Sequence, residues 1–130
     1  MTNLIDKAVD IKGKKYVLVS DRVLAFNEEY PKGSIKTELV SEPSDKHIIV
    51  KAIITPDTAI PERQFTGYAQ EVIGEGYINK TSALENAETS AVGRALAMMG
   101  IGVIDSIASV DEINKANKPI PKGNIIDDKF

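Results

Sequence analysis

Small residues at a fixed spacing restrict the fold of this chain more than any other feature of its sequence. Four alanines recur at every fourth position in its second half: Ala83, Ala87, Ala91 and Ala95. Residues four apart lie on the same face of an α-helix, so this spacing predicts a helix with a ridge of small side chains. Such a ridge allows the helix backbone to lie close to the surface on which it packs.

Capping signals indicate where this helix begins and ends. Ser82 and Glu85 have the spacing of a capping box, in which each side chain can satisfy an orphan backbone N–H group. Gly100 and Gly102 supply the C-terminal stop. Larger apolar residues flank the ridge and are expected to make the main core contacts: Leu84, Val92, Leu96 and Met99.

Three segments before the helix alternate between apolar and polar residues, which is typical of β-strands: 34–41, 47–55 and 64–72. The links between them are rich in Pro, Ser and Asp, which favours turns. The spacing therefore predicts an antiparallel meander of three strands. Gly67 and Ala69 share one face of the third strand and offer a matching surface for the alanine ridge.

The N-terminal part adds two shorter elements, a strand from Lys14 to Val19 and a helix over 20–30. The predicted fold class is α+β, with an antiparallel three-strand meander packed on one long helix, a β-β-β-α core, and this additional strand and short helix. An OB-like barrel is the alternative, but it requires five strands, and only four are clear before Ser82. We expect one domain over 1–118, with a short helix near 111–116, and a flexible tail over 119–130.

Composition excludes several classes of function. The 130 residues include no cysteine, which excludes disulfides and zinc–thiolate sites. His47 is the only histidine and no P-loop motif occurs, so we expect no enzyme, no metal and no cofactor. The N-terminus does not resemble a signal peptide and no apolar run is long enough to span a membrane, which favours a cytoplasmic protein. The formal net charge of −3 argues against nucleic-acid binding through bulk charge alone.

The stretch NKTSALENAETSAVGRALAMMGIG, preceded by a three-strand meander, resembles a phage family of single-strand annealing and single-stranded-DNA-binding proteins. It is more remotely similar to the ring-forming recombination mediator Rad fifty-two, whose core is a β-β-β-α unit. The shared helix pattern has an Ala-Leu-Glu start, an Ala-rich middle, and the basic residue Arg94 before Ala-Leu and Gly100. This resemblance implies an oligomer with a single-stranded-DNA site at Arg94, although Gly93 and Ala97 stand where the mediator has further basic residues.

Two further groups fit the chemistry of single-strand binding, which needs cations for phosphates and flat rings for base stacking. The first lies on the strand face opposite the proposed helix and consists of Lys36, Lys51 and Tyr68. The second lies near the N-terminus and consists of Lys12, Lys14, Lys15, Tyr16 and Arg22. The alternative interpretation is that the lysines are solvated surface and that the tyrosines lie at the edge of the core. In this interpretation Arg94 forms an ion pair with Glu88 or Glu71, or is exposed on the far side of its helix.

Two features suggest protein partners. Ile49 and Ile53 share the outward face of the second strand, and exposed apolar area of this kind usually meets a partner, so we expect a homo-oligomer. The alternative is that the N-terminal strand and helix cover this face. The chain end resembles the acidic tip by which bacterial single-strand-binding proteins dock replication and repair proteins, with matching residues Asp127, Asp128 and Phe130. This tip would bind phage or host replication and recombination proteins. An ordinary acidic chain end is the alternative.

The resulting hypothesis is a non-enzymatic protein of the host-cell cytoplasm that binds single-stranded DNA and promotes strand annealing or protection in phage recombination or replication. Annealing requires no hydrolysis, because duplex formation is downhill once the strands are held extended. The first alternative is a phage single-strand-binding protein without annealing activity. The second alternative is a structural or regulatory oligomer that binds no DNA, which the net acidity favours.

Overall fold

The computed structural model describes residues 4–42, 46–74, 76–105, 107 and 113, and for 76–81 it describes the backbone alone. The elements in these ranges are the 3-10 helix η1 (Leu4–Lys7), β1 (Val9–Ile11), β2 (Lys14–Tyr16), α1 (Val19–Glu29), β3 (Ser34–Leu39), β4 (His47–Thr55), β5 (Phe65–Val72) and α2 (Gly76–Met98). The tail predicted over 119–130 lies outside the described residues, as does the helix predicted near 111–116 apart from Ile113. No helix in the described ranges combines the length and apolar character that a membrane crossing requires.

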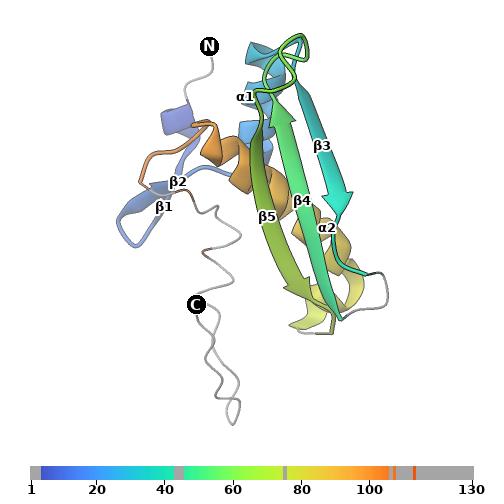
Figure 1. The fold of residues 1–130 in the computed structure, drawn as a ribbon. Helices are drawn as coiled ribbons and strands as arrows, with labels where there is room; N and C mark the ends of the chain where they lie inside the picture. The colour runs from blue at the N-terminus through green and yellow to red at the C-terminus, as the bar shows by residue number, and fades with distance from the viewer. Residues whose placement is uncertain (1–3, 43–45, 75, 106, 108–112, 114–130) are drawn as a thin grey trace.

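Strands β3, β4 and β5 form an antiparallel sheet with β4 at its centre (Figure 1). Consecutive strands are neighbours, so the sheet is the meander that the alternating sequence predicts. Helices α1 and α2 lie on one side of this sheet, which makes a two-layer α+β fold. The predicted fold class is confirmed. The alternative of an OB-like barrel is wrong, because the described strands form an open three-stranded sheet and a separate strand pair.

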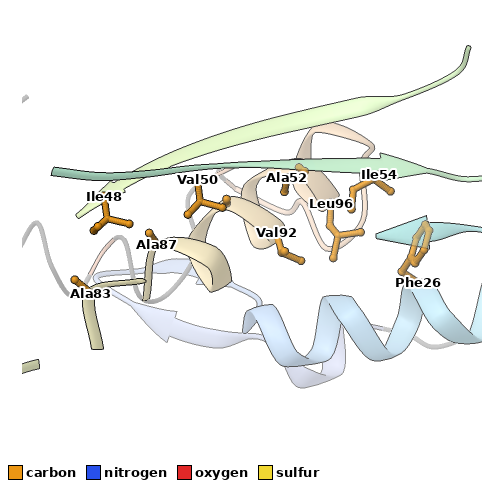
Figure 2. Packing of buried hydrophobic residues seen from close by; sticks show 11 residues of the cluster. Phe26, Ile48, Val50, Ala52, Ile54, Ala83, Ala87, Val92 and Leu96 are labelled. Carbon is orange, nitrogen blue, oxygen red and sulfur yellow. The ribbon is translucent and has the colours of Figure 1, made fainter. Parts of the chain in front are cut away.

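The hydrophobic core lies between the sheet and the two helices. Figure 2 shows the apolar residues of β4 directed at α2 and α1: Ile48, Val50, Ala52 and Ile54. On the helix side, Ala87, Ala91 and Ala95 are fully buried. A Cβ atom on Gly67 of β5 would lie 2.5 Å from the backbone nitrogen of Ala95 and 2.7 Å from the carbonyl oxygen of Ala91. The close packing predicted from the small residues is therefore confirmed.

Helix α2 is interrupted at Ser82, the residue predicted to start it. Ser82 has a φ of −143° and a ψ of 31°, so a kink separates the helical turns before and after it. Beyond the kink, Val92 and Leu96 are buried, as predicted. Leu84 is half exposed instead of buried. The reason is that Ala83 takes the buried position, and the next residue is turned by about 100° around the helix axis.

The N-terminal strand is shorter than predicted and belongs to a separate hairpin. It ends at Tyr16 and pairs with β1, which the sequence analysis did not identify. Lys12 and Gly13 form the two-residue turn, with positive φ angles of 52° and 83° that match the twist of a tight hairpin. Helix α1 follows at once, and its Phe26 joins the main core beside Ile54.

Candidate nucleic-acid interface

The sheet face that points away from α1 and α2 is called the outer face. Its residues alternate along each strand with the core positions: Lys36 and Glu38 of β3, His47, Ile49, Lys51 and Ile53 of β4, and Thr66, Tyr68 and Gln70 of β5. Successive side chains of a strand point to opposite faces, so burial of Val50 and Ala52 against α2 places Lys51 on the other side. The outer face therefore combines cationic, apolar and aromatic side chains.

Lys51 and Tyr68 are direct neighbours across β4 and β5. The Nζ atom of Lys51 lies 5.8 Å from the centroid of the Tyr68 ring, within the range of a cation–π interaction. Tyr68 keeps 53% of its surface exposed, so a flat molecule has access to its ring. The ammonium group lies over the ring, so a nucleobase that stacks there meets the ring and the cation together, and the cation can also neutralise a nearby phosphate.

Lys36 and Glu38 add opposite charges to this surface from β3. Lys36 is exposed and pairs in register with Ile53, one row away from Lys51. The three outer-face residues selected from strand alternation, Lys36, Lys51 and Tyr68, therefore share one surface. Glu38, which the sequence analysis did not select, is the direct partner of Lys51 and lies in the same row as Tyr68.

The residues of the predicted N-terminal basic–aromatic group do not share one surface in the β1–β2 hairpin and α1. The lysines of this group are exposed: Lys12, Lys14 and Lys15. The Nζ atom of Lys15 lies 3.6 Å from a carboxylate oxygen of Asp10, and the backbone N–H of Lys15 donates to Asp105 at 2.7 Å. Tyr16 is buried, with 7% of its surface exposed, so its ring is not available for the base stacking that was predicted.

Arg22 lies in the interior and not in the nucleic-acid site predicted for it. Its guanidinium donates to the carbonyl oxygen of Gly93 at 3.1 Å and to that of Gly102 at 3.5 Å. A buried charge is tolerated when hydrogen bonds compensate for its lost hydration, and these bonds join α1 to α2 and to the segment after it. The helical spacing could have indicated this burial, because Arg22 shares a helix face with Val19 and Phe26, which are both buried.

Arg94 lies on the exposed side of α2, next to Ala95, which is buried under β5. Helix α2 packs on the inner face of the sheet (Figure 1), so Arg94 belongs to the helix layer, whereas Lys51 and Tyr68 lie on the outer face. The residues expected to bind DNA thus occupy four locations: the outer face, the hairpin, the interior at Arg22 of α1, and α2. The chain-end residues Asp127, Asp128 and Phe130 lie outside the described residues, and their role as a partner-binding tip stays a prediction.

The order α1-β3-β4-β5-α2 defines a two-layer α-β-β-β-α domain with an open sheet face that carries a cation–aromatic pair. A family model described as Slr1353 N-terminal dsRNA-binding domain-like matches residues 23–99, from within α1 to just past α2. This match covers more than half of the 130 residues, and the chain belongs to that family. No curated protein and no solved structure matches the chain.

This family assignment corrects the resemblance drawn from the helix sequence. The phage annealing proteins and the Rad fifty-two mediator are different families from the one whose model matches, so the resemblance was wrong. The helix pattern has a physical explanation that requires no common ancestry. Small residues at four-residue spacing are what a helix needs when its backbone lies against a strand, as Ala91 and Ala95 lie against Gly67.

Proposed function

We propose that this domain binds nucleic acid, and that a single strand lies on the outer face of its sheet. The description of the family supports the general class of ligand, because it names a domain like those that bind double-stranded RNA. The observation that carries the proposal is the Lys51–Tyr68 pair, in which an exposed ring and an ammonium group lie 5.8 Å apart. Stacking on aromatic rings and charge neutralisation are the two main sources of affinity for single strands.

The described side chains of α1 and α2 provide few exposed cations for binding a nucleic-acid duplex. Arg22 is the only basic residue of α1, and it is buried. Among the helix side chains that the structure describes, at 19–29 and 82–98, Arg94 is the exposed cation. Recognition of a duplex depends on protein cations that contact phosphates along several turns of the nucleic-acid helix. An aromatic ring, in contrast, can stack only on a base that is already unpaired. These charges therefore favour a single strand over a duplex.

The number of cations predicts a modest affinity that falls with salt. Lys36 and Lys51 are the lysines of the outer face, and the chain as a whole carries a net charge of −3. Each phosphate contact with a single strand contributes a slope of about −0.7 to the dependence of log K on log salt. Two such contacts give a slope of about −1.4, so the binding should be measured at low ionic strength.

Fluorescence anisotropy with labelled single-stranded DNA, single-stranded RNA and duplex RNA of one sequence tests the proposal. The single strands should bind at low salt, and Lys51→Gln and Tyr68→Ala should each weaken them. Lys7→Gln is the matched control, since Lys7 is exposed on η1 and outside the outer face. Failure of every probe to bind at low salt would remove the proposal.

Duplex RNA is a second candidate ligand, because the family description refers to it. In that case duplex RNA would bind more tightly than either single strand, and Tyr68→Ala would leave its affinity unchanged. Arg94→Gln would weaken it, since Arg94 is the exposed cation of the described helix side chains. The same titrations therefore distinguish the two candidates without a separate assay.

Strand annealing or protection is the finer form of the proposal. A nucleic-acid strand held on the outer face could pair faster with its complementary strand, which is annealing. It could instead be shielded from its complement, which is protection. In the described ranges, no group of three His, Asp or Glu side chains is placed to hold a metal ion. Mixing two labelled complementary strands decides the matter: faster duplex formation supports annealing, and slower formation supports protection.

Self-association would compete for the same surface. Ile49 and Ile53 lie on the outer face and are partly exposed, so a second copy could cover them. Light scattering with and without an oligonucleotide measures this competition. A mass above that of one chain which decreases when the oligonucleotide is added would mean that both partners use the outer face. A monomer mass at all concentrations would contradict self-association.

A further inference from the structure

One row of the outer face contains a carboxylate, an ammonium group and an aromatic ring. Glu38 of β3 pairs in register with Lys51 of β4, and Lys51 pairs with Tyr68 of β5. We propose that this Glu38–Lys51–Tyr68 row binds a guanine base of the single strand. The inference rests on the proposed function, because it assigns a base preference to the same surface.

The spacing of the three side chains across the strands fits one nucleobase stacked on Tyr68 with its hydrogen-bonding edge toward Lys51 and Glu38. Neighbouring strands lie about 4.8 Å apart, so Lys51 is one strand spacing from Tyr68 and Glu38 is two, or roughly 10 Å. Tyr68 is half exposed, and its ring lies 5.8 Å from the Lys51 Nζ atom. A base stacked on this ring with its hydrogen-bonding edge turned toward β4 would place that edge over Lys51, within reach of the Glu38 side chain.

Glu38 makes the row unsuited to phosphate alone. Its carboxylate is exposed on β3, where it repels the backbone of a nucleic acid and accepts hydrogen bonds only. A surface that bound nothing except phosphate would lose affinity through this residue. A surface that reads a base gains from it, because the carboxylate can accept from N–H groups on the base edge.

Guanine is the base whose edge matches this pair of charges. Its pairing edge places the O6 acceptor beside the N1–H and N2–H donors, so O6 can face the Lys51 ammonium and the two donors can face the Glu38 carboxylate. Cytosine and adenine each present one amino donor beside an unprotonated ring nitrogen. Thymine and uracil flank their single N–H with two carbonyl oxygens, and one of these would face the carboxylate.

The test uses four labelled oligonucleotides, each an eleven-residue thymidine strand with dG, dC, dA or dT at its central position. Anisotropy at low salt should give the dG strand an affinity higher than the dT strand by roughly fivefold or more, the lower end for a two-bond contact to a base. Glu38→Gln should reduce this preference to less than about twofold, and it should not weaken the dT strand, because a negative charge is removed. Glu85→Gln is the control, since Glu85 is exposed on α2 in the other layer.

The outcomes separate this inference from the proposed function. Equal affinities for the four strands, with binding still weakened by Tyr68→Ala, would overturn the guanine site and leave the proposed function standing. A dG preference that Glu38→Gln does not change would also overturn it. Absence of binding to all four strands would overturn both. Tyr68→Phe should keep the preference, because it keeps the ring and removes only the hydroxyl.

Discussion

Gly67 of β5 lies against Ala95 of α2 so closely that a Cβ atom on Gly67 would stand 2.5 Å from the Ala95 backbone nitrogen. This contact sets the separation between the sheet and the helix. It also determines the direction of the next residue, because successive side chains of a strand point to opposite faces. Gly67 faces the helix, and Tyr68 is thereby held on the outer face with half of its surface exposed.

Gly67→Ala should destabilise the domain. The added methyl group meets the backbone of α2, which cannot move without displacing the helix, and overpacking of this kind costs about 1–3 kcal/mol. The lower chain entropy of alanine in the unfolded state offsets only part of this cost. Urea unfolding measures the change, with Gln70→Thr at an exposed position of the same strand as the control. An unchanged midpoint for Gly67→Ala would contradict the close packing.

Arg22→Met should lower stability without lowering nucleic-acid affinity. The substitution leaves the carbonyl oxygens of Gly93 and Gly102 without their guanidinium donor, at a cost of about 1–3 kcal/mol. Arg63→Met provides the comparison, because Arg63 is exposed in the loop before β5, where its guanidinium carbon lies 4.9 Å from the Phe65 ring centroid, and loss of this exposed contact should change stability less. If the folded Arg22→Met protein bound oligonucleotide more weakly than wild type, the assignment of Arg22 to the interior alone would be incorrect.

Tyr68→Ala should weaken single-strand binding by about fivefold to a hundredfold, because stacking of one base on an aromatic ring contributes about 1–3 kcal/mol. Tyr68→Phe should bind within about twofold of wild type, since the ring remains. Anisotropy titrations compare the three proteins, and circular dichroism confirms that each is folded. Equal losses in both variants would mean that the hydroxyl, and not the ring, makes the contact.

For a thymidine strand, which has no guanine to occupy the Glu38–Lys51–Tyr68 row, Lys51→Gln should reduce the salt dependence as well as the affinity. Removal of one phosphate contact makes the slope of log K against log salt less steep by about 0.7. Arg94→Gln should leave the slope unchanged, because Arg94 belongs to α2 in the helix layer and not to the outer face. Titrations at several salt concentrations give the slopes. A changed slope in Arg94→Gln with an unchanged slope in Lys51→Gln would place the nucleic acid on the helix layer.

Local patterns predicted the elements that depend on nearby residues. The four-residue spacing of alanines and the alternation around Gly67 and Ala69 predicted a helix close to a sheet, and this was confirmed. The same alternation assigned Lys51 and Tyr68 to the outer face, because the face of a strand residue depends only on its own strand.

Features that depend on distant residues could not be predicted in this way. The row that joins Glu38 to Lys51 and Tyr68 requires the register between strands, which follows from turn geometry and packing. The hydrogen bonds of Arg22 reach residues more than seventy positions away, so its burial was missed despite its place on an apolar helix face. The family resemblance was wrong for a related reason. It rested on the α2 sequence, in which the demands of close packing dominate.

Binding of nucleic acid on the outer face is tested most directly by NMR. Amide and aromatic resonances are followed during titration with a single-stranded oligonucleotide. We expect the largest shifts on β4 and β5 around Lys51 and in the ring of Tyr68, with smaller shifts near Lys36 and Glu38 on β3. Shifts confined to α1 and α2, with the Tyr68 ring unaffected, would contradict binding on the outer face.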